Sequence, residues 1–208
     1  MKELIIIGAG GMGRTLYDLA KESVGFGAEF DIKGFIDDNL QALDGFDNYP
    51  PLLGKISEYV PRENDIFISS IGGASRVSCT EAIEAKGGIF TNIIHKTARI
   101  GTNVKMGNGN LIGAYVCVGA DASIGNYNMI QSYTVIGHDA RIGSQVRIDT
   151  HVVCVGGIIV EDETSIHTHA VISHNVVVGR GAKVGACSFV IRKVKPGTTV
   201  FGIPAKIL

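Results

Sequence analysis

The sequence has 208 residues, which is enough for one large domain or two small ones. Hydrophobic residues make up 45% and charged residues 19%, so the chain can bury a substantial core and is not expected to be disordered. The formal net charge is −1 and no run of Lys or Arg occurs, so we expect neither a nucleic-acid partner nor a membrane-surface patch.

The N-terminus carries only four consecutive apolar residues before Gly8, too few for a signal peptide or a membrane span. The four cysteines lie 33 to 38 residues apart and form no Cys-x-x-Cys pair. This usage is typical of reduced, buried small side chains, and it argues against a disulfide framework or a zinc knuckle. We therefore expect a cytoplasmic protein.

The first predicted element is a buried strand at residues 4–7. It leads into the glycine-rich run at residues 8–13, and a helical pattern follows through Leu16, Leu19 and Ala20. A glycine-rich turn from a strand into a helix can hold phosphates with backbone N–H groups. The same run is also compatible with a tight turn that binds nothing.

Two more strands are predicted at residues 33–36 and 65–71, with a helix from about 76 to 86. The first of these strands ends at Asp37 and Asp38, and Asp37 could accept hydrogen bonds from a ribose or a base. The alternation predicts a small parallel, Rossmann-like α/β half-domain over residues 1–90, with ligand loops at the strand ends. An NAD-binding fold is an alternative, but a nucleotide linked to a sugar suits a half-size module better.

From Ile94 to Val190 the sequence repeats every six residues without an insertion. Fifteen of the seventeen lead residues are Ile or Val, and Gly follows the lead residue in nine hexads. Small or β-branched side chains dominate four residues after the lead. We interpret the lead residues as pointing inward from flat strands, and the glycines as supplying the backbone conformation of tight turns.

Three hexads make one triangular coil of 18 residues, so residues 91–208 are predicted to form a parallel β-helix. Residues 18 apart should lie above one another. This rule stacks His151 on His169 and Asp149 on His167, and it places His138 and His174 in one column, two coils apart. The spacing itself does not decide the handedness of the coils.

With both halves considered, the chain resembles the sialic-acid O-acetyltransferase and UDP-amino-sugar N-acetyltransferase family, which includes the bacillosamine-pathway acetyltransferase. The resemblance covers nearly the full length. It rests on Gly-Ala-Gly-Gly-Met-Gly (8–13), Gly-Phe-Ile-Asp-Asp-Asn (34–39), Ser-Ile-Gly-Gly (70–73), Ile-Gly-His-Asp (136–139) and Gly-Ile-Pro-Ala-Lys (202–206). It implies a left-handed β-helix, a homotrimer, and transfer of an acetyl group from acetyl-CoA to a nucleotide-linked amino sugar.

The resemblance also implies roles for particular residues. The catalytic pair falls on His138 and Asp139. Contacts to the nucleotide sugar fall on Gly10, Gly11, Met12, Asp37, Asp38 and Gly72. Contacts to acetyl-CoA fall on Gly156, Thr168 and Ala186, through backbone atoms. Arg147 stands where a relative has a second His near the acetyl group, which leaves the acyl-chain preference open.

The chemistry of acyl transfer explains why a His–Asp pair suits this place. An amine or hydroxyl that attacks a thioester must lose a proton, and imidazole titrates near neutral pH. Asp139 can reach His138 only if both lie at a corner of a coil, and their third and fourth places in a hexad permit that. A backbone N–H is expected to stabilise the oxyanion, but the sequence does not indicate which one.

Three alternatives remain open from the residues. The acyl acceptor can be a hydroxyl, as in sialic-acid or other sugar O-acetylation. A γ-carbonic-anhydrase-like metal site would need three histidines separated by 36 and 5 residues, but His138 and His174 lead to Gly179, and His169 and His174 lead back to Tyr133. The stacked group of Asp149, His151, His167 and His169 is a further possible ligand set, although we expect no metal. The third alternative is a binding scaffold without catalysis.

Overall fold

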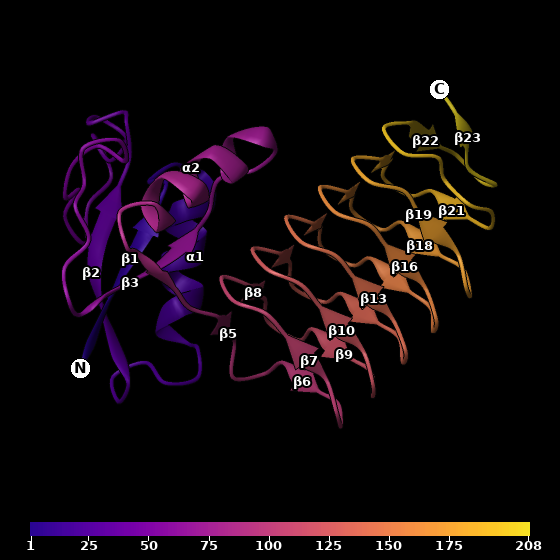
Figure 1. The fold of residues 1–208 in the computed structure, drawn as a ribbon, viewed down its shortest axis with the longest axis horizontal. Coiled ribbons are helices and arrows are strands. Elements are labelled where there is room, and N and C mark those ends of the chain that lie inside the picture. The colour runs from indigo at the N-terminus through magenta and orange to yellow at the C-terminus, as the bar shows by residue number, and fades with distance from the viewer. The chain divides into compact units, whose positions relative to one another are not determined.

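The structure is a computed structural model that describes residues 1–73 and 75–208. The chain divides into two compact units, Met1–Lys96 and Thr97–Leu208. Figure 1 shows the helices and strands of each unit. Within the part of the chain that the structure describes, no helix is both long enough and apolar enough to cross a membrane.

The N-terminal unit is a parallel α/β unit, as predicted. Its elements, in chain order, are β1 (Lys2–Ile7), α1 (Gly11–Lys21), β2 (Phe30–Ile36), β3 (Asp65–Ser69), α2 (Ala74–Glu84), β4 (Ile89–Phe90) and β5 (Ile93–Ile94). The first four strands form one parallel sheet in the order β2-β1-β3-β4. This order places the loops after β1, β2 and β3 at the same edge of the sheet, where the glycine-rich run and the two acids lie.

The core of this unit follows from the apolar runs of the central strands. Residues 4–7 of β1 are fully buried, and so are Phe35 on β2 and Phe67 on β3. Buried strands with an unbroken apolar run are typical of a parallel sheet covered on both faces. Helix α1 buries Leu16 and Ala20, two of the three residues whose spacing predicted it.

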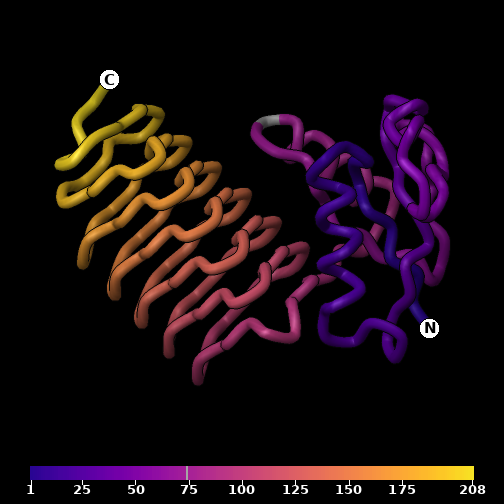
Figure 2. Tube along the Cα trace, turned by 180° about the vertical axis from the view of Figure 1, so that it is seen from behind, coloured from indigo at the N-terminus to yellow at the C-terminus, as the bar shows by residue number. Residues whose placement is uncertain are grey.

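The C-terminal unit is a left-handed β-helix whose coils are stacked without interruption, as Figures 1 and 2 show. Each coil contributes three short strands, one to each of three parallel sheets. The first sheet has the order β6-β9-β12-β15-β18-β21, the second β7-β10-β13-β16-β19, and the third runs from β8 through β11, β14, β17, β20 and β22 to β23. Paired residues are 18 apart, such as Ile136 and Cys154, so the predicted coil length is confirmed.

The strands of the coils are two residues long, apart from the last but one. They are β6 (Arg99–Ile100), β7 (Lys105–Met106), β8 (Leu111–Ile112), β9 (Cys117–Val118), β10 (Ser123–Ile124), β11 (Met129–Ile130), β12 (Val135–Ile136), β13 (Arg141–Ile142), β14 (Arg147–Ile148), β15 (Val153–Cys154), β16 (Ile159–Val160), β17 (Ser165–Ile166), β18 (Val171–Ile172), β19 (Val177–Val178), β20 (Lys183–Val184), β21 (Phe189–Val190), β22 (Thr199–Phe201) and β23 (Lys206–Ile207). The lead residue ends its strand and points into the prism. Ile136, for example, is 1% exposed.

The corners of the prism need a left-handed backbone, but not at the glycines that we expected. From Asn103 to Cys187, φ is positive at the fourth residue of each hexad, and most of these residues are not glycine. The glycine after the lead residue has no positive φ, so our interpretation of its role was wrong. A Cβ on Gly119 would lie 2.5 Å from the backbone N of His138, and a Cβ on Gly137 would lie 2.5 Å from that of Gly156. These glycines permit the close approach of successive coils.

The cysteines also differ from expectation in part. All four are free thiols, and Cys154 is buried inside the prism, where burial raises the pKa of its thiol to about 12. Cys187 is exposed, and Cys79 and Cys117 are half-buried. Cys187 occupies the fourth place of its hexad at a corner, where the side chain points outward, so its sequence character did not predict its burial.

Candidate active site

His138 and Asp139 lie together at the corner between β12 and β13. We call this column of corners the His corner. His138 Nδ1 lies 2.6 Å from Asp139 Oδ2, and the two side chains are 63% and 65% exposed. The positive φ of Asp139, 56°, bends the chain so that adjacent side chains can meet. Because a carboxylate only accepts hydrogen bonds, Nδ1 carries the proton and Nε2 is left to act as a base.

Gly156 lies one coil beyond His138 and gives its ring a place to rest. A Cβ on Gly156 would lie 2.5 Å from His138 Nε2 and 2.7 Å from Cε1. His174, one coil further, donates from Nδ1 to the Gly156 carbonyl at 2.8 Å, and its ring centroid lies 6.1 Å from that of His138. The predicted column is confirmed, and the missing side chain of Gly156 is what allows the two rings to approach.

The backbone N–H groups at the third place of the hexads separate the corners into two kinds. At the corner after β13, which we call the capped corner, side chains of the next hexads accept these N–H groups. Asn126 accepts from Asn108 at 2.9 Å, Ser144 from Asn126 at 3.0 Å, and Asp162 from Ser144 at 2.8 Å. The capped corner therefore has little donor capacity left for a ligand.

The residues implied for acetyl-CoA occupy the other kind of corner. Gly156 lies at the His corner, while Thr168 and Ala186 lie at the corner after β14 and its equivalents, which we call the aromatic corner. The backbone N–H groups of these three residues make no hydrogen bond within the described chain. Exposed, unpaired N–H groups at about 4.8 Å spacing can bind the carbonyl oxygens of an extended ligand.

The aromatic corner takes its name from a column of stacked rings. Tyr115, Tyr133, His151 and His169 follow one another with centroid spacings of 5.1, 5.0 and 4.8 Å. The spacing is that of the strands below, so the rings stack because the coils do. The stacking predicted for His151 and His169 is confirmed.

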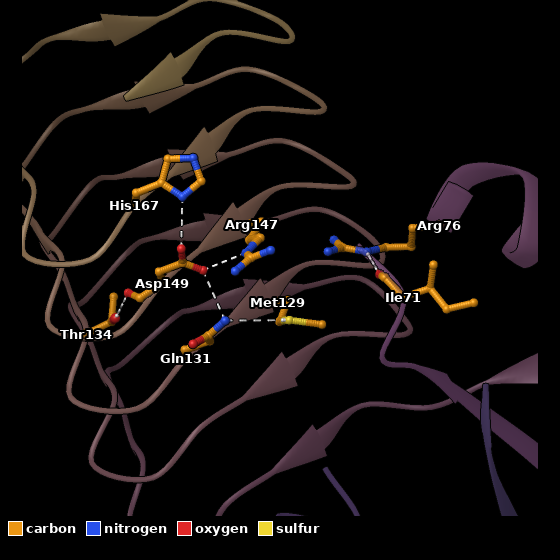
Figure 3. A network of polar contacts seen from close by, with 8 residues as sticks. All are labelled: Ile71, Arg76, Met129, Gln131, Thr134, Arg147, Asp149 and His167. Atoms are coloured by element: carbon orange, nitrogen blue, oxygen red, sulfur yellow. Dashed lines mark hydrogen bonds and ion pairs between the residues drawn. The ribbon is translucent and has the colours of Figure 1, made fainter. Parts of the chain in front are cut away.

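Arg147, implied as a donor contact, lies on β14 and belongs to a polar network (Figure 3). Its Nε donates to Asp149 Oδ1 at 2.6 Å, and His167 Nδ1 lies 3.0 Å from Asp149 Oδ2. The predicted column of Asp149 and His167 is therefore confirmed. In the described residues, no group of three or more His, Cys, Asp or Glu side chains is arranged to hold a metal ion.

In the N-terminal unit, the glycine-rich run wraps the start of α1. Gly10 is the N-cap residue, Gly11 begins the helix and Met12 is half-buried. A Cβ on Gly11 would have no atom closer than 3.9 Å, whereas a Cβ on Gly13 would lie 2.0 Å from the Gly8 carbonyl oxygen. Gly13 thus serves the packing of the turn, and Gly10 and Gly11 keep their N–H groups accessible to a ligand.

The acids after β2 already serve the backbone. Asp37 Oδ2 accepts from the Ala9 N–H and Oδ1 from the Asn39 N–H, both at 2.8 Å. Asp38 Oδ1 accepts from the Ile56 N–H at 3.0 Å. We expected Asp37 to face a ribose or base; instead it first holds the glycine-rich run in place. A carboxylate has about four acceptor positions, so both acids keep capacity for a ligand.

One residue at this edge was missed by sequence reasoning. The Arg14 guanidinium lies 3.6 Å from the centre of the Phe46 ring, and its Nη1 donates to the Ala9 carbonyl at 3.4 Å. It places a positive charge beside the glycine-rich run. A basic residue directly after that run was the available signal. Gly72 lies exposed in the loop between β3 and α2 at the same edge of the sheet.

Comparison with known proteins agrees with both units. The model of the PglD N-terminal domain matches residues 3–77. WeeI from Acinetobacter baumannii AYE is 27% identical, with a TM-score of 0.87 and full coverage of both chains. The acetyltransferase domain of PglB from Neisseria gonorrhoeae FA1090 is 26% identical, with a TM-score of 0.91 and full coverage of both chains, and it has also been solved in complex with acetyl coenzyme A.

Two further likenesses are more limited. PerB from Caulobacter crescentus, solved in complex with CoA and GDP-perosamine, shares the fold at 23% identity, with a TM-score of 0.89 over 100% of this chain and 98% of that one. A stretch of 34 residues is 56% identical to serine acetyltransferase of Escherichia coli (strain K12). That stretch covers 16% of this chain and spans only 12% of that relative's length.

Proposed function

Because this chain belongs to the hexapeptide-repeat acyltransferases that carry a PglD-type N-terminal domain, we propose that it transfers an acetyl group from acetyl-CoA to the amino group of a nucleotide-linked sugar. The observation that carries the proposal is the His138–Asp139 pair, with Nδ1 bound and Nε2 available beside Gly156. The relatives support the donor and the acceptor class, since the PglB domain binds acetyl-CoA and PerB binds GDP-perosamine.

In this reaction the sugar amine attacks the thioester carbonyl while His138 Nε2 takes a proton from the amine. Asp139 holds the ring in the tautomer that leaves Nε2 unprotonated. The new C–N bond forms, the C–S bond breaks, and coenzyme A leaves as the thiol after receiving the proton. The Gly156 N–H, unused within the described chain and close to the His138 ring, is the candidate donor to the oxyanion.

The two units divide the binding. The N-terminal unit takes the nucleotide sugar through Gly10, Gly11, Met12, Asp37, Asp38 and Gly72, with Arg14 beside the phosphates. The β-helix takes acetyl-CoA through the backbone of Gly156, Thr168 and Ala186 and through Arg147. We further propose a cytoplasmic homotrimer. Sedimentation equilibrium of the full chain tests the assembly, and a monomer at working concentrations would contradict it.

The test of function is a product analysis. The enzyme is incubated with acetyl-CoA and a panel of UDP-, GDP- and dTDP-amino sugars, and products are identified by mass spectrometry. We expect an acetyl group on nitrogen and an equal amount of free CoA thiol. Acetyl on oxygen, with a sialic acid or another sugar, would shift the assignment to O-acetylation, and no thiol release from any acceptor would refute acyl transfer.

The catalytic pair has its own test. His138→Ala should lower kcat by roughly 10²- to 10⁴-fold, the range for loss of a general base. Ligand affinity and melting temperature should stay close to wild type, because the side chain is 63% exposed. Asp139→Asn should cost less, since it keeps the base. Wild-type turnover by His138→Ala in an assay limited by chemistry would mean that the base lies elsewhere.

A further inference from the structure

Asp149 is a buried carboxylate surrounded by three donors on the outer side of the sheet that contains β14 (Figure 3). Its side chain is 8% exposed. Oδ1 accepts from Arg147 Nε at 2.6 Å and from Gln131 Nε2 at 3.0 Å, and Oδ2 lies 3.0 Å from His167 Nδ1. Because the carboxylate only accepts, His167 also carries its proton on Nδ1. The negative charge of Asp149 is therefore fully occupied by groups of this chain.

Arg147 is held on one side only. Its Nε is bound to Asp149, and its side chain is 40% exposed. Nη1 and Nη2 make no hydrogen bond within the described chain. A guanidinium is planar, so the bond at Nε limits where the two terminal amino groups can point. The result is a fixed pair of donors directed away from the sheet, a shape that suits ligand oxygens.

The coils beyond Arg147 keep this face of the sheet polar. Ser165 pairs with Arg147 in the next coil, and Lys183 pairs with Ser165 in the coil after that. Lys183 is exposed, and neither residue has a hydrogen-bond partner for its side chain within the described chain. With Asp149 neutralised, the outer surface of these coils presents two positive charges and a hydroxyl, which favours an oxygen-rich ligand.

We infer that Asp149 is a positioning residue that holds Arg147 so that Nη1 and Nη2 bind an oxygen atom of the acyl-CoA donor. This inference rests on the proposed function, in which Arg147 contacts the donor. Asp149 itself touches no substrate. Its effect on donor binding passes through Nε of Arg147, so the two residues must act as one unit.

A double-mutant cycle tests that coupling. Arg147→Gln, Asp149→Asn and the double variant are compared for CoA affinity by calorimetry and for the KM of acetyl-CoA. Each single variant should weaken donor binding by about 10- to 100-fold, the effect of losing a charge-assisted hydrogen bond. The double variant should bind no more weakly than the weaker single variant. Additive losses, or unchanged donor affinity in Asp149→Asn, would overturn the inference.

Two controls separate positioning from stability. Gln131→Ala removes another donor to the same carboxylate and leaves the Arg147 bond, so donor KM should stay within about twofold of wild type. In an Arg147→Lys background, which lacks Nε, the added Asp149→Asn change should leave donor affinity unaltered. Melting temperatures recorded for every variant show whether any loss of affinity follows unfolding.

The source of the oxygen is resolved by changing the donor. Acetyl-CoA and S-acetylpantetheine share the acyl and pantetheine oxygens but differ in the phosphates. An Asp149→Asn effect seen with both donors assigns Arg147 to the shared part, and an effect seen only with acetyl-CoA assigns it to a phosphate. If the unmodified enzyme transfers acetyl from neither donor, the proposed function fails. If Asp149→Asn transfers acetyl with wild-type donor KM, only the positioning role fails.

Discussion

Gly156 and Gly137 illustrate two uses of glycine within one column of the His corner. At Gly156 the nearest neighbour of an added Cβ is the tip of the His138 ring, a side chain that can move. At Gly137 it is the backbone N of Gly156 in the next coil. The first contact is adjustable and the second is not, so the same substitution should have different consequences at the two positions.

We predict that Gly156→Ala lowers kcat while leaving stability nearly intact. The new methyl group would displace His138 Nε2 from its place, at a cost of at least about 100-fold in rate for a misplaced base. Gly137→Ala serves as the matched control, and it should lower the free energy of unfolding by a few kcal/mol through overpacking. Steady-state kinetics and thermal unfolding of both variants check this contrast, and a fully active Gly156→Ala would contradict the proposed position of the base.

At the scale of elements, the start of β3 is tied to β2 by a buried ion pair. Asp65, whose side chain is inaccessible to solvent, lies 2.6 Å from Lys33 Nζ on β2 and accepts from the Tyr59 hydroxyl at 2.8 Å and from the Arg62 N–H at 2.8 Å. Burial alone would raise the pKa of Asp65, but the bonds from Lys33, Arg62 and Tyr59 hold it below its ordinary value of 3.8. Burial and the bond to Asp65 raise the pKa of Tyr59 to about 12.

These shifts give the pH dependence of the N-terminal unit a definite sign. The lowered pKa of Asp65 contributes stability above pH 3.8 that is lost as pH falls through the folded-state pKa. The raised pKa of Tyr59 contributes stability below pH 10.0 that is lost as pH rises toward 12. Unfolding followed by circular dichroism should therefore show losses at both extremes.

Asp65→Asn should lower the free energy of unfolding by about 3–5 kcal/mol near neutral pH, because Lys33 loses its buried partner. The difference from wild type should shrink as the pH falls below 3.8 and Asp65 becomes protonated. Glu3→Gln is the control, since Glu3 also binds Lys33 but is 49% exposed and should cost less than about 1 kcal/mol. A constant difference across acidic pH would show that Asp65 is not ionised in the folded protein.

For the whole molecule, we predict that substrate binding separates by unit. Gly11→Val should raise KM for the nucleotide sugar at least about tenfold by blocking approach to the glycine-rich run, while CoA affinity stays unchanged. Space for the side chain exists, because no atom lies within 3.9 Å of the added Cβ except Arg14 Nη2 at that distance. Gly13→Ala, which would collide with the Gly8 carbonyl, should instead destabilise the unit. Loss of CoA binding by Gly11→Val would contradict the division of labour.

How far the sequence predicted the molecule depends on the range of the interactions. Period six and the 18-residue column rule depend on local chain geometry, so they placed His138 at a corner and paired Asp149 with His167. Strand β2 begins three residues earlier than expected and α2 begins two residues earlier, because neighbouring strands and loops extend the pairing.

The missed features depend on contacts between distant segments or on side-chain rotamers. Asp37 binds the backbone of Ala9, 28 residues away, and Arg14 stacks on Phe46 in a loop without a repeat. The bond from Arg147 to Asp149 spans only two residues, but it requires both side chains to turn outward from one strand. No periodicity in the sequence indicates such contacts, so they became visible only in the folded chain.

The unbroken repeat has a consequence for how this chain can change in length. Since three hexads complete one turn, a residue's number also encodes its angle about the axis of the prism. Losing 18 residues shortens the stack by one storey and leaves every later residue on its own edge. Losing six rotates everything downstream by a third of a turn, so that Thr168 and Ala186 would move to a different edge from the one they occupy now. Length variation in such a chain is tolerated in whole turns, much as a reading frame tolerates whole codons.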